Sequence, residues 1–235
     1  MIVIENISLH FAGTAYPVLD KINYQINVAD FVVVLGSNGS GKSSLLKLLD
    51  KRYQASSGNI TLDNKLLSNY SAKEFSRCVK TLSQNTHESL FSSLTVYENY
   101  LLVNNEKSDR EHLKKYLLKF NVNLAQKLDQ MVDQLSGGEK QALALALTVL
   151  HPPRLLLLDE HTSALDPKSA ENIITLTRNI IREYNITCLL TTHDLSIAEQ
   201  YGNRVLALKN GKIYKCIEQQ DKLKINQEIL LAVCY

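Results

Sequence analysis

Apolar positions recur with the period of strands at the start of the chain and with the period of helices soon after. Residues 2–11 alternate between apolar and polar side chains, which predicts a half-buried strand, and a second strand is predicted over residues 18–28. The uninterrupted apolar run 31–35 is typical of a strand buried on both faces. A glycine-rich turn follows it, and then come leucines at helical spacing, at positions 45, 46, 48 and 49. This order of strand, turn and helix is the one that a phosphate-binding loop requires.

The middle of the chain, residues 85–135, lacks apolar strands and carries helix-start signals instead. Thr95 with Glu98, and Ser108 with Glu111, have the spacing of a capping box, in which a hydroxyl and a carboxylate satisfy free backbone amides at a helix start. We therefore expect a helical subdomain in this part of the chain.

Strands and helices alternate again after the middle segment, which predicts a mostly parallel sheet. A helix through residue 150 precedes a strand at 155–158. A second helix, which Asp166 and Pro167 open, precedes a strand at 187–192.

The sheet is predicted to finish in an antiparallel hairpin. Short strands at 205–208 and 213–214 flank Asn210 and Gly211, a pair favoured in tight turns because both residues tolerate positive φ. Beyond residue 215 a polar stretch leads to the apolar residues 229–233, which fit either a short closing helix or a strand.

Composition and charge exclude several classes of protein. The chain has 235 residues, of which 45% are apolar and 21% charged, the profile of a folded globular protein. Its 26 basic and 24 acidic residues are spread along the sequence and give a net charge of +2, so we expect no nucleic-acid partner. The four cysteines lie too far apart for a metal-binding pair or a dense disulfide framework, and we expect reduced thiols.

No segment of the sequence has the character of a membrane anchor. The first residues lack the charged start and long apolar stretch of a signal peptide. The longest apolar stretch, 142–150, is far short of the roughly 20 residues that span a bilayer. We therefore expect a cytoplasmic protein that reaches a membrane through a partner.

The segment GSNGSGKS at 36–43 matches the pattern GxxxxGKS of a phosphate-binding loop. The backbone amides of such a loop surround phosphate oxygens, and the start of the following helix favours negative charge. Lys42 would reach the β- and γ-phosphates of a nucleotide, and the Ser43 hydroxyl would bind Mg²⁺. The alternative is an ordinary glycine turn, which the strand before it and the leucine-rich helix after it disfavour.

Two carboxylates follow the buried strand 155–158. Asp159 stands where an acid can hold Mg²⁺ through water, and Glu160 stands where a carboxylate can polarise a water that attacks the γ-phosphate. Taken alone, an apolar run that ends in Asp-Glu is as often a strand meeting solvent. The phosphate-binding loop upstream favours the catalytic interpretation, with Glu160 as the base and Asp159 as a metal ligand.

A second anion-binding segment, LSGGE at 135–139, precedes a helix rich in alanine and leucine and presents free amides and a hydroxyl at a positive helix end. With the phosphate-binding loop and the Asp-Glu strand in this order, the chain resembles the ATPases of ABC transporters, whose signature is LSGGQ. The resemblance implies the α/β P-loop NTPase fold of that family within one domain, 1–235. Residues 1–84 and 136–235 would form the mostly parallel RecA-like core with an amino-terminal antiparallel β subdomain, and 85–135 the helical signature subdomain.

The resemblance implies ATP and Mg²⁺ as cofactors and assigns roles to individual residues. Gln84, after the strand 79–82, matches the glutamine that links the metal to the transporter. His193, after the strand 187–192, matches the switch histidine that contacts the γ-phosphate and helps position the glutamate and water, and Lys42 completes the catalytic set. The implied metal ligands are Ser43, Gln84 and Asp159. The implied nucleotide-binding residues are Phe11, Ser37, Asn38, Gly39, Ser40, Gly41, Lys42, Ser43, Ser44, Ser136, Gly137 and Gly138.

Two aromatic rings compete for the adenine. Phe11 stands where the family usually places an aromatic residue against the base, and Tyr16 is the other candidate. Phe11 has a further alternative as a packed core residue.

The chain departs from the family pattern at two positions. Glu139 replaces the commoner glutamine of the signature, and His161 occupies the place where a proline usually follows the Asp-Glu pair. His161 either tunes the site by titrating beside Glu160 or is a surface histidine. The segments DEHTSALDP at 159–167 and YGNRV at 201–205 are similar to those of importer ATPases that accompany solute-binding lipoproteins, and SALD within the first lies across the family's dimer interface.

The resemblance implies several partners. Because the family's helical subdomain projects away from the core, Ser136 and Gly138 of one copy would contact the γ-phosphate held by Lys42 of a second copy, in a head-to-tail, ATP-bridged homodimer. Integral membrane permease subunits would dock near 85–99, which includes Phe91 and Tyr97. A solute-binding protein outside the cell, a location on the cytoplasmic face of the plasma membrane, and import of amino acids or related small metabolites complete the expectation.

Three other functions use parts of the same pattern. A soluble ABC ATPase acting on the ribosome or on nucleic acid is disfavoured by the balanced charge and by the lack of a second ATPase cassette. An exporter subunit is disfavoured because no membrane domain is fused to the chain. A P-loop kinase would need neither LSGGE nor a histidine at a strand end.

Overall fold

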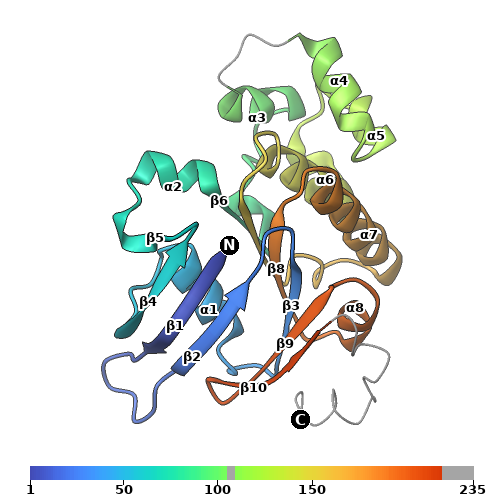
Figure 1. Cartoon of the computed structure of the whole chain (residues 1–235). Coiled ribbons are helices and arrows are strands. Elements are labelled where there is room, and N and C mark those ends of the chain that lie inside the picture. Colours follow the sequence, from blue (N-terminus) through green and yellow to red (C-terminus); the bar gives the residue numbers. More distant parts are fainter. Residues whose placement is uncertain (105–108, 219–235) are drawn as a thin grey trace. The chain divides into compact units, whose positions relative to one another are not determined.

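The computed structural model describes residues 1–104 and 109–218 (Figure 1). The described chain forms two compact units: 1–81, 153–160 and 180–218 make up the first, and 82–152 with 161–179 the second. The division into 1–84 with 136–235 and 85–135 stays a prediction. Ser108, the segment 229–233 and Cys234 lie outside the described residues, and Cys78, Cys188 and Cys216 are free thiols.

The first unit contains the expected amino-terminal antiparallel sheet, whose strands follow the order β2-β1-β4-β5. Strand β1 pairs antiparallel with both β2 and β4, so that Ile2 stands opposite Ile26 on one side and Leu62 on the other. The strands are β1 (Ile2–Leu9), β2 (Leu19–Ile26), β4 (Ser57–Leu62) and β5 (Lys65–Leu66).

The core sheet has six strands in the order β10-β9-β3-β8-β7-β6. The pairs β3–β8, β3–β9 and β7–β8 are parallel, and the closing hairpin β9–β10 is antiparallel, which confirms the predicted mostly parallel sheet. Every residue of β3 is buried, as its apolar run predicts, and every residue of β8 is buried as well. The strands are β3 (Phe31–Leu35), β6 (Val79–Ser83), β7 (Leu155–Asp159), β8 (Thr187–Thr192), β9 (Arg204–Lys209) and β10 (Lys212–Ile217).

Three helices of the first unit accompany these sheets: α1 (Lys42–Leu49), α2 (Ala72–Cys78) and α8 (Leu195–Gln200). The apolar pattern predicts α1 but neither α2 nor the strands β4 and β5. The reason is burial, because α2 has no buried residue and β4 has only Ile60 and Leu62. Helix α2 is instead defined by a capping box between Ser71 and Glu74.

The second unit is helical, with α3 (Val96–Val103), α4 (Arg110–Leu118), α5 (Val122–Ala125) and α6 (Gly137–Thr148), and it contains the start of α7 (Pro167–Glu183). The predicted capping box of Thr95 and Glu98 opens α3. At α4 the side chain that accepts the backbone N–H of Glu111 belongs to Asp109. Tyr116 joins α4 to α6 by donating its hydroxyl to the Ala146 carbonyl at 2.7 Å. Among the described residues, no helix is long and apolar enough to cross a membrane.

A buried charge pair fastens the amino-terminal end of β3 to β9. The Arg204 guanidinium donates to Asp30 Oδ2 at 2.9 Å, and the two side chains are only 13% and 10% exposed. Asn203 accepts the Phe31 N–H at 2.8 Å, and Gly202 packs so closely that a Cβ there would lie 2.6 Å from Val33 Cγ2. The segment YGNRV therefore has a structural role at this end of the sheet.

Replacing Arg204 by methionine is expected to destabilise the fold by about 3 kcal/mol, because Asp30 loses its cationic partner in a buried site. Arg154→Met is the matched control. It removes a surface ion pair with Asp63, whose side chains are 62% and 36% exposed, and should cost less than about 1 kcal/mol. Urea denaturation of both variants measures the difference, and equal losses would contradict the assigned role of burial.

Candidate functional site

Three parallel strands bring the predicted catalytic segments to one edge of the core sheet. Leu35 at the end of β3 stands opposite Thr192 at the end of β8, and Asp159 at the end of β7 stands opposite Thr191. The loop 36–41, Glu160 and His193 therefore leave the sheet at the same level. Ligands of open parallel sheets bind at this edge.

The phosphate-binding loop has a backbone that only glycine allows at two points. A Cβ on Gly36 would lie 2.3 Å from Ser40 Oγ and 2.5 Å from the Leu208 carbonyl oxygen. Gly41, at the N-cap of α1, has φ of +104°. No side chain caps this helix and no acidic residue lies in its first turn, so its first amides are available to an anion.

Lys42 lies within the loop with only 5% of its side chain exposed. Its ammonium group donates to the carbonyl oxygens of Gly36 at 2.8 Å and Ser37 at 3.2 Å. The same nitrogen lies 3.7 Å from Glu160 Oε1. One cation therefore contacts both the loop and the carboxylate that follows β7.

Ser43 and Asp159 are in direct contact, so both side chains are close enough to serve one metal ion. The Ser43 hydroxyl donates to Asp159 Oδ1 at 3.0 Å, and the Thr191 hydroxyl donates to the same oxygen at 2.6 Å. The hydroxyl of Ser43 in the first turn of α1 and the carboxylate of Asp159 at the end of β7 supply the hard oxygen donors that Mg²⁺ prefers. The residues present thus fit this ion.

Glu160 has an unusual backbone, with φ of +47° in the left-handed region that non-glycine residues rarely adopt. Its N–H donates to both the carbonyl oxygen and the hydroxyl of Thr191, each at 3.2 Å, which stabilises the turn. Its second carboxylate oxygen lies 3.5 Å from Nδ1 of His193, a side chain that is 61% exposed. Thr191 is a residue of this site that the sequence pattern did not identify, because only the register of β7 and β8 brings it to Asp159 and Glu160.

Four other predicted residues belong to the second unit. Gln84 is exposed directly after β6. Ser136 is the N-cap of α6, and Gly137 and Gly138 form the first turn of that helix. Their roles stay predictions.

His161 is neither the titrating residue nor the surface histidine that the sequence suggests. It is 2% exposed, so it is not a surface residue, and burial lowers its pKa to about 3. Its Nε2 lies 3.3 Å from the hydroxyl of Thr177, which donates to the Ile173 carbonyl. His161 is therefore an uncharged core residue at neutral pH and does not tune the site by titrating.

The two adenine candidates have different surroundings. Phe11 is 37% exposed and meets the ring of Tyr53 edge-on, with centroids 5.2 Å apart. Tyr16 is 82% exposed and lines a groove that contains Gly39 and the β9–β10 turn. Both side chains are exposed, Tyr16 more than Phe11.

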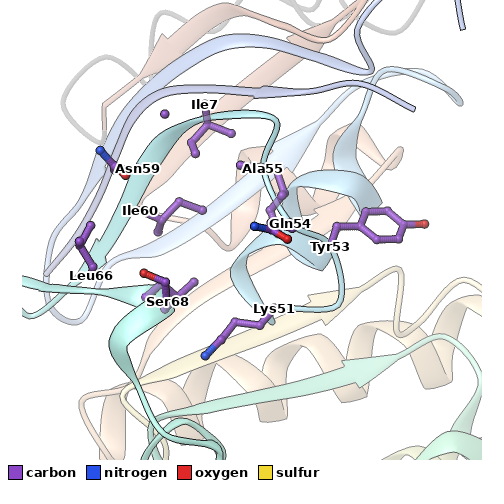
Figure 2. Close-up of a pocket in the computed structure, with 12 residues that line it drawn as sticks. Ile7, Lys51, Tyr53, Gln54, Ala55, Asn59, Ile60, Leu66 and Ser68 are labelled. Atoms are coloured by element: carbon purple, nitrogen blue, oxygen red, sulfur yellow. The ribbon is translucent and has the colours of Figure 1, made fainter. Parts of the chain in front are cut away.

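A separate pocket of about 490 Å³ lies beside β4 and the chain that follows α1 (Figure 2). Its lining includes none of the predicted site residues. The Lys51 ammonium at its wall donates to the Tyr70 carbonyl at 3.0 Å and lies 5.1 Å from the centre of the Phe75 ring, so this cation serves the local packing. This pocket is therefore separate from the predicted ATP site.

Comparison with known proteins assigns the chain to a family. Residues 19–163 match the family described as ABC transporter. The tyrosine transport ATP-binding protein of Clostridioides difficile (strain R20291) is 35% identical, and the alignment covers 98% of this chain and 97% of that protein. The methionine import ATP-binding protein MetN 1 of Staphylococcus aureus (strain N315) is 34% identical, over 88% of this chain but only 62% of the length of MetN 1.

A solved structure agrees with this assignment. The dimeric structure of MJ0796, a bacterial ABC transporter cassette, matches the fold with a TM-score of 0.77 and 27% identity, over 93% of this chain and 99% of that one. The chain therefore belongs to the ABC transporter family, as an ATP-binding subunit with ATPase activity.

Proposed function

We propose that two copies of this chain hydrolyse ATP between them and drive a separate membrane permease that imports a solute. The observation that carries the proposal is the meeting of Lys42, Asp159, Glu160 and His193 at the carboxyl edge of one sheet. A cation, a metal-binding acid, a general base and an imidazole are the groups that phosphoryl transfer to water needs.

The loop 36–43 and the start of α1 hold the phosphates of ATP through backbone amides, and Lys42 supplies the positive charge. The uncapped amides behind Gly41 support this role. Ser43 and Asp159 hold Mg²⁺, and Gln84 is a further ligand. When bound, Mg²⁺ neutralises charge on the phosphate oxygens.

Glu160 is the general base that accepts a proton from the attacking water. Its carboxylate lies between Lys42 and His193, at 3.7 and 3.5 Å, and its backbone is held by Thr191. The same threonine donates to Asp159, so one hydroxyl positions the base and the metal ligand together. His193 orients Glu160 and contacts the γ-phosphate.

A second copy of the chain completes each site. The chain contains each motif once, and in the homodimer the Ser136 hydroxyl and the Gly138 amide of one copy contact the γ-phosphate held by Lys42 of the other. The dimeric structure of the MJ0796 cassette supports the pairing of two copies. Two-fold symmetry then gives two equivalent ATP sites, and loss of the bridging phosphate on hydrolysis reopens the dimer.

The partner in the membrane is an integral permease, which docks on residues 85–99. Phe91 in this segment is 63% exposed, which suits a contact surface. The names of the two relatives, tyrosine transport and methionine import, support an amino acid or a related small metabolite as the cargo. The chain then works on the cytoplasmic face of the membrane, and a solute-binding protein delivers the cargo from outside.

Glu160→Gln is expected to lower ATP turnover at least about 100-fold, because the amide cannot accept the proton. In ATP and Mg²⁺ the variant should accumulate as an ATP-bound dimer, measured by gel filtration beside the parent. Glu171→Gln, an exposed carboxylate on α7, is the control and should leave both properties unchanged. Normal hydrolysis by the Glu160 variant would overturn the catalytic assignment.

Phe11→Ala is expected to weaken ATP binding about tenfold, since stacking of a base on an aromatic ring contributes about 1–3 kcal/mol. Tyr16→Ala should change the affinity less than about twofold. Titration with a fluorescent ATP analogue measures both dissociation constants. The opposite order would assign the adenine to Tyr16.

Phe91→Asp is expected to lower recovery of the permease about tenfold when the tagged chain is extracted from cell membranes in mild detergent, because a charge enters an apolar contact. Val28→Asp is the matched control, since Val28 is 66% exposed but lies on the first unit. Quantitative mass spectrometry of integral membrane proteins measures recovery. Equal recovery with Phe91→Asp and the parent would exclude this docking segment.

A further inference from the structure

The helix that carries the signature begins with a charged capping box. Ser136 Oγ accepts the Glu139 N–H at 3.3 Å, and Glu139 Oε2 accepts the Ser136 N–H at 3.0 Å. The Glu139 carboxylate is therefore hydrogen-bonded directly to the backbone amide of Ser136, the N-cap residue of α6. This is the helix end that the proposed function directs at a γ-phosphate.

The other oxygen of this carboxylate has its own partner. Lys127, just beyond α5, donates to Glu139 Oε1 at 2.7 Å. The Glu139 side chain is only 9% exposed, while that of Lys127 is 33% exposed. Such a partly buried, short ion pair is screened less by solvent than a surface pair.

Glu139 carries its charge at neutral pH. Burial raises the pKa of this carboxyl, but the hydrogen bonds from Lys127 and from the Ser136 backbone outweigh it, so the pKa lies below its ordinary value. A glutamine at this position would make the same capping hydrogen bond without a charge. The glutamate therefore adds a negative charge at an anion-binding helix end.

The capping box itself does not need the lysine. Glu98 forms the same box with Thr95 at the start of α3, and within the described residues no cation pairs with it. Glu74 forms a third box at α2 and pairs with Lys65 at 3.2 Å, but that pair is on the surface, with 41% and 54% of the side chains exposed. Lys127 is thus associated with the one capping glutamate that is both buried and placed in the signature.

We propose that Lys127 is an electrostatic partner of the signature, which cancels the charge of Glu139 so that the start of α6 can accept the γ-phosphate of ATP bound to a second copy. This inference rests on the proposed dimeric ATPase. Lys127 acts through Glu139 and is a positioning residue. The net charge of the Lys127–Glu139 pair, rather than the ion pair as a structural contact, sets how strongly two copies associate when ATP is bound.

Three variants in a Glu160→Gln background separate charge from structure. Lys127→Met leaves the carboxylate uncompensated and should raise the dissociation constant of the ATP-bound dimer about tenfold or more. Glu139→Gln leaves Lys127 uncompensated and should lower that constant about two- to threefold. The double variant restores a net charge of zero and should return to within about twofold of its parent. Sedimentation velocity in ATP and Mg²⁺ measures the constants.

Salt provides an independent readout. The loss in Lys127→Met should shrink between about 0.05 and 0.5 M salt, because screening weakens repulsion between the carboxylate and the phosphate. Lys65→Met, which removes the surface partner of Glu74, is the matched control and should leave the dimer constant unchanged.

The outcomes distinguish a failure of the proposed dimeric ATPase from a failure of the charge role of Lys127. If the parent forms no ATP-dependent dimer, the proposed function fails and the inference with it. If the parent dimerises but Glu139→Gln weakens the dimer as much as Lys127→Met does, the pair is a structural tie and the charge role is wrong. The same holds if the double variant stays as weak as Lys127→Met.

Discussion

The register of three fully or largely buried parallel strands is the constraint on which the site depends. Leu35 faces Thr192 and Asp159 faces Thr191, so the loop after β3, the carboxylates after β7 and the histidine after β8 leave the sheet together. A slip of one residue would turn the side chains of each strand to the opposite face. Because the strands are buried on both faces, the hydrogen-bonded ladder and the packing of the side chains hold this register, and through Thr191 they also hold the backbone of Glu160.

The charged side chains at the two ends of the core sheet are paired at different distances. At the amino-terminal end of β3, Asp30 and Arg204 are paired and buried, and they fasten β9 in place. At the carboxyl end, Glu160 lies between Lys42 and His193 at looser distances of 3.7 and 3.5 Å, and His193 is mostly exposed. A fixed pair suits stability, whereas a carboxylate with longer contacts and a solvent-facing partner can exchange them for a substrate. The contrast lies in the contact distances and in the exposure of Glu160 and His193, because Lys42 is itself only 5% exposed.

The sequence predicts the parts of this fold that depend on strong local patterns. The apolar runs identify β3, β7 and β8, and Asn210-Gly211 identifies the hairpin, where both residues have positive φ, 50° and 74°. It does not predict β4 or α2, because few of their side chains are buried. Nor does it predict Thr191 or the burial of His161, since the first depends on pairing between strands far apart in sequence and the second on packing against Thr177 of α7.

The two helix starts of the proposed ATP site show what a lysine outside the recognised motifs can contribute. A carboxylate in the first turn stabilises a helix through its dipole and its free amides. The same carboxylate opposes a phosphate that approaches those amides. Helix α1 avoids the conflict, with glycine at its N-cap and no acid in its first turn. Helix α6 does have an acid in its first turn, Glu139, which caps the helix but would repel an approaching phosphate. Lys127 lies 2.7 Å from this carboxylate, where it can offset the negative charge and leave the capping hydrogen bond in place.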